Sequence, residues 1–153
     1  MLAKRKPLPE KFGEIIFSTK MPSIIDSKNE VLDNILETLT KHKLMDDEMG
    51  IRLSLDEALS NCIIHGNKRD PEKKVSIELF FKGKKWGVIF EDEGDGFIPK
   101  EIPDFNDPVN LLAEGGRGVF LMHYYMDKVS YCGKGNVLEL VRTCGKKRKR
   151  VED

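Results

Sequence analysis

The spacing of apolar residues changes near residue 75, and this change restricts the fold more than any other feature of the chain. Before it, apolar residues recur at intervals of three and four, which predicts an amphipathic helix over about 24–44 and a second over about 48–65. After it, apolar residues alternate with other residues along 75–81 and 86–90, and the short turn between these runs predicts a hairpin. The chain therefore combines packed helices with closely spaced strands.

Shorter patterns complete the predicted order of elements. A strand over 14–19 precedes the helices, and a proline-containing stretch over 97–115 has the character of a long, functional loop. A helix over 116–126 and strands over 128–132 and 137–142 follow. The order β, α, α, β, β, loop, α, β, β predicts an α+β fold, a two-layer α/β sandwich whose mixed, mostly antiparallel sheet carries helices on one face.

The composition predicts a single cytoplasmic domain. The 153 residues have 39% hydrophobic content and equal numbers of basic and acidic side chains, so no net charge attracts nucleic acid or a membrane surface. Three widely spaced cysteines predict a reduced protein, and no apolar run is long enough for a signal peptide or a membrane span. We expect one domain over 14–145, a flexible arm over 1–13, and a solvated charged tail over 146–153.

The second predicted helix carries an acid and an amide on one face. Glu57 and Asn61 are four residues apart, so they lie one turn apart and outside the apolar stripe. The amide oxygen is a hard ligand that suits magnesium, and the carboxylate can accept a proton from water or a hydroxyl group. The pattern fits a magnesium-phosphate centre, and an exposed polar pair remains the alternative.

The strand over 86–90 runs directly into Asp92, Gly94 and Gly96, a D-x-G-x-G motif. An aspartate at a strand end can accept a hydrogen bond from an exocyclic amine, while the glycines let the backbone approach a flat ligand. The segment does not fit a calcium-binding loop. If the loop starts at Glu91, its position 12 is Ile102, where a bidentate glutamate is needed. A plain hairpin turn remains open.

Glycines also cluster where the helix over 116–126 begins. Gly115, Gly116 and Gly118 leave backbone N–H groups unshielded at a helix start, and Arg117 adds a cation. These features favour a phosphate site, although a glycine-rich loop before a helix is common. The motif is neither a Walker A loop nor a Rossmann fingerprint.

The order of the three motifs resembles the GHKL ATPase and kinase superfamily. The stretches LDEALSNCIIHGNK and GGRGVFLM are most similar to its small single-domain branch, the bacterial anti-sigma-factor serine-protein kinases. The resemblance covers about 14–143 and implies a histidine-kinase-like ATPase fold that binds ATP with Mg²⁺. It also implies a serine/threonine-protein kinase that acts in transcription regulation, phosphorylates a small antagonist protein and binds a sigma factor, with a homodimer as a further expectation.

The resemblance assigns a role to each residue of the motifs. Asn61 would coordinate Mg²⁺, Glu57 would be the general base, and Asp92 would bind the adenine amino group. The remaining expected nucleotide-binding residues are Gly94, Gly96, Gly115, Gly116, Arg117 and Gly118, with 97–115 as the ATP lid. His65 and Asn67 would line the phosphate side, and for His65 a structural role at the helix end is an equal alternative.

Two alternative functions remain open. Glu114 stands where related kinases often carry an arginine, which favours a nucleotide-gated binding module with little or no kinase activity. The catalytic piece of a histidine kinase is a third hypothesis. It needs a helical hairpin with an accepting histidine, and His42 is the only candidate in a chain that has no room for the hairpin.

Overall fold

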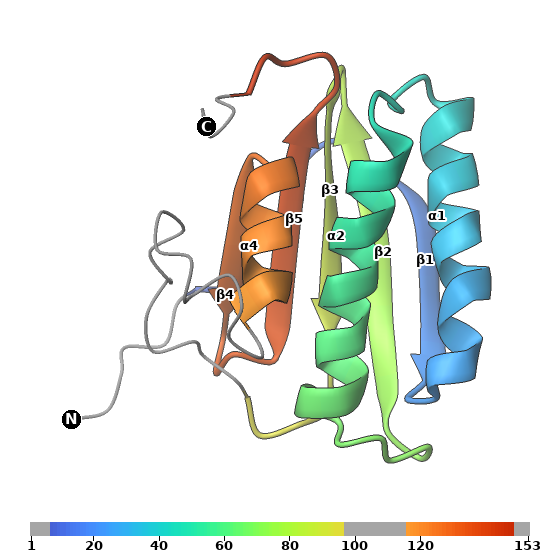
Figure 1. Ribbon diagram of the computed structural model, residues 1–153, viewed down its shortest axis with the longest axis vertical. Coiled ribbons are helices and arrows are strands. Elements are labelled where there is room, and N and C mark those ends of the chain that lie inside the picture. The colour runs from blue at the N-terminus through green and yellow to red at the C-terminus, as the bar shows by residue number, and fades with distance from the viewer. Residues whose placement is uncertain (1–6, 97–115, 149–153) are drawn as a thin grey trace.

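The computed structural model describes residues 7–96 and 116–148, which form a sheet covered by helices on one face (Figure 1). The five strands are in the order β1-β2-β3-β5-β4. They are β1 (Glu14–Pro22), β2 (Lys74–Lys82), β3 (Lys85–Glu91), β4 (Lys128–Cys132) and β5 (Val137–Thr143). The covering helices are α1 (Lys28–Lys41), α2 (Glu48–Asn61) and α4 (Gly116–Tyr125). The α+β two-layer prediction is confirmed, and each described strand pair is antiparallel.

The alternating pattern in β2 and β3 builds the core between the sheet and the helices. Ile77 lies opposite Phe90, and Leu79 lies opposite Val88, so these side chains share one face of the sheet. All four are fully buried, together with Leu55 of α2. The sheet thus holds α2 rigidly above β2 and β3, the two strands whose ends border the predicted site.

The helix boundaries differ from the sequence predictions at both ends of α1. Strand β1 continues to Pro22, and a short 3-10 turn (Ile25–Ser27) comes before the helix. At the other end, Lys43 adopts a left-handed backbone with φ of 58°, which ends the helical run before Leu44. The apolar spacing predicted the helix correctly. Because this spacing continues through the flanking turns, it overestimated the length of the helix.

The segment before β1 is partly fixed on the sheet, against the prediction of a flexible arm over 1–13. The ring of Phe12 packs edge-on against Phe80, with 4.7 Å between centroids. Lys11 Nζ lies 2.8 Å from Glu78 Oε1. Both contacts lie on the sheet face opposite the helices, where Phe80, Ile89 and Phe12 belong to a second small apolar cluster.

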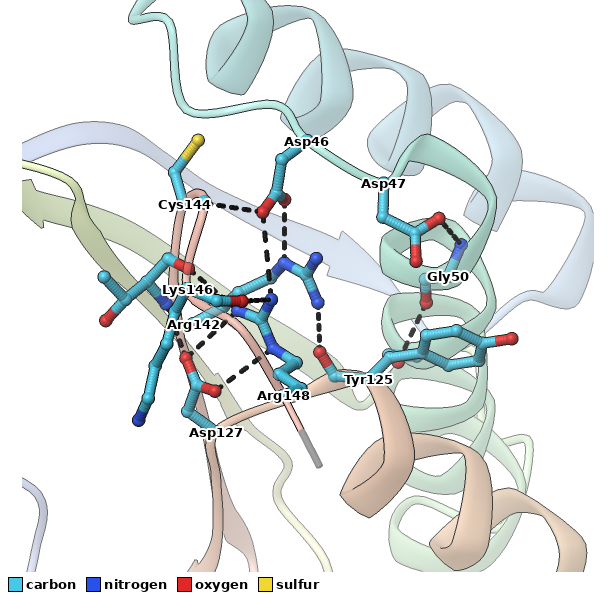
Figure 2. A network of polar contacts seen from close by, with 12 residues as sticks. Asp46, Asp47, Gly50, Tyr125, Asp127, Arg142, Cys144, Lys146 and Arg148 are labelled. Carbon is cyan, nitrogen blue, oxygen red and sulfur yellow. Dashed lines mark hydrogen bonds and ion pairs between the residues drawn. The ribbon is translucent and has the colours of Figure 1, made fainter. Parts of the chain in front are cut away.

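The segment after β5 is also fixed, so the prediction of a solvated tail from residue 146 is wrong for Arg148 (Figure 2). Arg148 donates to Asp127 at 3.1 Å, and Arg142 donates to Asp46 at 2.9 Å and to the carbonyl of Tyr125. The side chains of Arg142 and Asp46 are 4% and 19% exposed. This polar cluster ties the end of β5 to the loop before α2 and to the end of α4.

Within residues 7–96 and 116–148, no helix combines the length and the apolar character that crossing a bilayer requires.

Candidate functional site

The last turn of the second helix is a π-helix (Cys62–Gly66). Asn67 N–H donates to the carbonyl of Cys62 at 2.8 Å, five residues back, which closes the wide turn. The turn brings Gly66 against the end of β3, where a Cβ would overlap the carboxylate of Asp92. Glycine is therefore required at Gly66, and the end of α2 and the acid of the D-x-G-x-G motif form one site.

Asp92 is 6% exposed and lies at the floor of this site. One of its carboxylate oxygens, Oδ1, accepts a hydrogen bond of 2.9 Å from Gly94 N–H, and the carboxylate retains acceptor capacity for a ligand amine. Burial raises the pKa of Asp92, and together with the charge of Glu91 it outweighs the opposing hydrogen bond from Gly94 and the charges of Lys134 and Lys73. A buried acceptor of this kind discriminates strongly between a ligand that donates a hydrogen bond and one that cannot.

The two later glycines of the motif lie against other backbone segments. A Cβ at Gly94 would overlap the carbonyl of Gly66, and one at Gly96 would overlap the carbonyl of Lys134. Gly96 also has φ of +102°, in the region that favours glycine. The motif thus needs glycine for close packing against the protein's own backbone, and the approach of these glycines to a ligand stays a prediction.

The turn between β4 and β5 supports the same loop, which the sequence did not indicate. Asp92 N–H donates to the carbonyl of Asn136 at 2.9 Å, and Asn136 Nδ2 donates back to the carbonyl of Asp92 at 3.2 Å. Lys134 of this turn adds a nearby positive charge. These residues follow Asp92 by about forty positions, and only the pairing of β3 with β5 brings them together.

Glu57 lies beside the first turn of α4. The helices α2 and α4 run side by side (Figure 1), and a Cβ at Gly118 would overlap the Glu57 carboxylate. Since the first N–H groups of a helix have no intrahelical acceptors, this is where a phosphate group would bind. The structure therefore joins the predicted base to the predicted anion site.

Asn61 ends α2 beside the hydroxyl group of Tyr131 in β4. Burial raises the pKa of Tyr131 to about 12, and the neighbouring Asn61 amide opposes this rise. The amide oxygen of an asparagine is a hard, neutral ligand, so Asn61 is a residue that could hold Mg²⁺. Tyr131 has no sequence signal, because a strand residue gives no indication of the helix above it.

The two residues at the end of the π turn differ in exposure. His65 is exposed, and its expected place near the phosphates stays a prediction. Asn67 is 1% exposed and binds Ser23, Lys74 and Glu93. The expectation that Asn67 lines the phosphate side is therefore wrong, because all the polar groups of its amide are used inside the protein.

Some predicted site residues lie outside the described part of the chain. These are the lid over 97–115, including Glu114 and Gly115, and the side chain of Arg117. Gly116 and Arg117 contribute backbone to the start of α4. No group of three or more His, Cys, Asp or Glu residues that could hold a metal occurs in residues 7–96 and 116–148.

Residues 27–142 match the family described as the histidine kinase-like ATPase domain. The match includes α2, the end of β3 and the start of α4, which are the elements that build the site. The chain belongs to the histidine kinase-like ATPase family. The predicted resemblance and fold are thereby confirmed.

Several bacterial regulators are similar to this family member. The serine-protein kinase RsbW of Bacillus subtilis is 32% identical over 90 residues, which cover 55% of this chain and 56% of the relative. The anti-sigma F factor of Oceanobacillus iheyensis is 32% identical over 89 residues, covering 56% and 60%. The anti-sigma F factor of Geobacillus kaustophilus is 32% identical over 109 residues, covering 67% and 73%. The chain thus spans little more than half the length of the first two.

Proposed function

We propose that this protein is a cytoplasmic, ATP-dependent serine/threonine-protein kinase that acts as an anti-sigma factor or partner-switching regulator and phosphorylates a small antagonist protein. One observation carries the proposal: Glu57 lies against Gly118 at the start of α4, one turn from Asn61. This placement supports a site in which a base, a magnesium ligand and an anion site act together, as phosphoryl transfer requires. The names of the relatives support the kinase and anti-sigma roles.

In the proposed complex, ATP lies between the end of β3 and the start of α4. The adenine amino group donates to Asp92, and the backbone at Gly94 and Gly96 borders the purine. The phosphates bind at the N–H groups that begin α4, where the positive end of the helix dipole favours them. Asn61 holds the magnesium ion, which when bound neutralises part of the triphosphate charge.

Glu57 then accepts the proton of the incoming serine or threonine hydroxyl group. The hydroxyl oxygen forms a bond to the terminal phosphorus as the bond to the bridging oxygen breaks, and ADP leaves with that oxygen. The protein contributes chiefly position and charge, because such transition states need little covalent help. Phosphate on the antagonist adds charge at a packed interface, so the modified antagonist no longer competes with a sigma factor for this protein.

Glu57→Gln tests the assignment of the base. The variant keeps the shape of the side chain, so we expect ATP affinity within about threefold of the unaltered protein and loss of at least about 100-fold in phosphotransfer rate. Calorimetry with ATP and Mg²⁺ measures binding, and labelled ATP with the antagonist captured by a nucleotide-dependent pull-down measures transfer. Equal transfer by both proteins would remove Glu57 from the mechanism.

The same experiment separates the alternative function. If the unaltered protein binds ATP and its partners but transfers no phosphate, then it is the nucleotide-gated binding module that Glu114 favours, and the kinase proposal is wrong.

Asp92→Asn tests the adenine contact, because the amide cannot replace the carboxylate as an acceptor of equal strength. We expect this variant to lose affinity for ATP and ADP alike, by about tenfold.

A further inference from the structure

We infer that Asn67 is a positioning residue for the adenine-binding loop, and that its buried amide determines how strongly Asp92 selects a purine with an amino group. The inference rests on the proposed function, since it assumes that Asp92 binds adenine. Asn67 itself is buried, and its amide binds groups of the protein rather than facing the proposed ligand.

The amide of Asn67 joins three separate segments of the chain. Its Oδ1 accepts from Glu93 N–H at 2.8 Å, in the loop that follows β3. Its Nδ2 donates to Ser23 Oγ at 2.7 Å, after β1, and to the carbonyl of Lys74 at 3.0 Å, where β2 begins. Glu93 directly follows Asp92, so the first of these bonds fixes the peptide group next to the adenine acceptor.

The orientation of this amide is fixed by its partners. The carbonyl of Lys74 can only accept, and the N–H of Glu93 can only donate, so the two ends of the Asn67 amide cannot be exchanged. At 1% exposure, water cannot replace any of the three partners. Ser23 is in turn held by a bond of 2.6 Å to the carbonyl of Lys73.

The rest of the loop is supported from other directions, which isolates what Asn67 contributes. Asn136 holds the backbone of Asp92 on the β5 side. The Glu93 carboxylate accepts from Lys74 N–H at 2.7 Å, but Glu93 is exposed and water competes for that bond. Asn67 is thus the buried support on the α2 side, and without it the Glu93 peptide has no fixed partner there.

The backbone after Asn67 adds a second reason for a rigid support. Lys68 and Arg69 both have positive φ, 52° and 60°, which side-chain-bearing residues rarely adopt in succession. Arg69 N–H donates to the carbonyl of Ile63 at 2.8 Å, so this strained turn closes onto the π helix. Strain of this kind persists where surrounding contacts determine the conformation, and the Asn67 bonds are such contacts.

The test measures purine selectivity rather than stability. ATP and inosine triphosphate differ at the purine 6-position, where an amino group donates and an oxo group accepts, so their affinity ratio reports how Asp92 is placed. We expect the unaltered protein to bind ATP at least about tenfold more tightly than inosine triphosphate, by calorimetry with Mg²⁺. In Asn67→Ser we expect this ratio to fall by about tenfold.

Two further variants make the result decisive. Ser23→Ala removes only one of the three bonds, so it serves if Asn67→Ser does not fold, and we expect its ratio to fall by about threefold. Asp46→Asn is the control, because it weakens the polar cluster at the opposite end of α2 and should leave the ratio unchanged while lowering the melting temperature.

The outcomes distinguish the inference from the proposed function. If the unaltered protein binds both nucleotides equally, then Asp92 does not read the purine and the proposed site is wrong. If it prefers ATP and the folded Asn67→Ser variant keeps that preference, then the positioning role is overturned. Should only Ser23→Ala fold, an unchanged ratio in that variant overturns it. A reduced ratio, with the Asp46→Asn ratio intact, supports it.

Discussion

The contact between Glu57 and Gly118 shows how one residue can determine the geometry of the proposed site. The glycine lets the carboxylate lie directly against the start of α4, and any Cβ there would occupy its space. Since the obstructing atoms form the far end of a flexible side chain, a substitution displaces Glu57 rather than the helix. Position and stability are therefore separable at this residue.

We predict that Gly118→Ala slows phosphotransfer by about 10- to 100-fold and leaves the melting temperature unchanged or raised. Alanine favours a helix over glycine by up to about 1 kcal/mol, while a base displaced by about 1 Å loses much of its effect. Thermal unfolding and the phosphotransfer assay measure the two effects. Gly50→Ala is the control, because a Cβ there would overlap the ring of Tyr125 and should destabilise the α2–α4 contact. An unchanged transfer rate in Gly118→Ala would show that this contact does not place Glu57.

At the scale of elements, helix α4 is held at its end by the polar cluster of Figure 2. Arg142, with a side chain 4% exposed, links the carbonyl of Tyr125 at the end of the helix to Asp46 in the loop before α2. Asp46 also accepts from Gly145 N–H at 2.7 Å. The ends of three elements thus depend on one carboxylate.

We predict that Asp46→Ala lowers the free energy of unfolding by about 3 kcal/mol, because it leaves the buried guanidinium of Arg142 without its carboxylate. Asp33→Ala removes a comparable ion pair with Arg52 from the surface, where the Asp33 side chain is 67% exposed. That control should change the free energy of unfolding by less than about 0.5 kcal/mol. Urea denaturation measures both, and equal losses would contradict a structural role for the cluster.

The elements themselves could largely be predicted from the sequence, because helix and strand periodicity are local properties. Glu57, Asn61 and Asp92 could also be singled out as candidates, since their residue types and spacing suit the chemistry, and their roles stay predictions. The residues that support the site could not be predicted, because Asn136 and Tyr131 meet it only through strand pairing and layer packing. The binding of Arg148 to Asp127 was missed for the same reason, as a basic run alone gives no indication of a distant acid.

At the scale of the whole molecule, two aspartates affect stability with opposite signs. Burial alone would raise the pKa of Asp46, but hydrogen bonds from Arg142 and Gly145 and the charges of Arg142 and Arg148 outweigh it, so its pKa lies below 3.8. Burial raises the pKa of Asp92 above the same ordinary value. The folded state therefore stabilises the charged form of Asp46 and destabilises that of Asp92.

The two effects occur in different pH windows. As the pH falls below 3.8, Asp46 becomes protonated in the unfolded chain before it does in the folded protein. The stability that Asp46 contributes is therefore lost as the pH falls toward its lowered pKa in the folded protein. As the pH rises above 3.8, the unfolded chain releases the proton of Asp92 first, so the free energy of unfolding decreases until the raised pKa is passed.

We therefore predict opposite changes in the pH profile of unfolding for two matched variants. Asp46→Asn should remove part of the rise in the free energy of unfolding that occurs below pH 3.8. Asp92→Asn should remove the decrease that occurs above pH 3.8, and this variant should be at least as stable as the unaltered protein at neutral pH. Urea denaturation from about pH 3 to about pH 7 measures both profiles. A loss of stability at neutral pH in Asp92→Asn would show that the Asp92 carboxylate is a structural group. A gain would indicate that the protein retains a destabilising buried acid for binding its nucleotide.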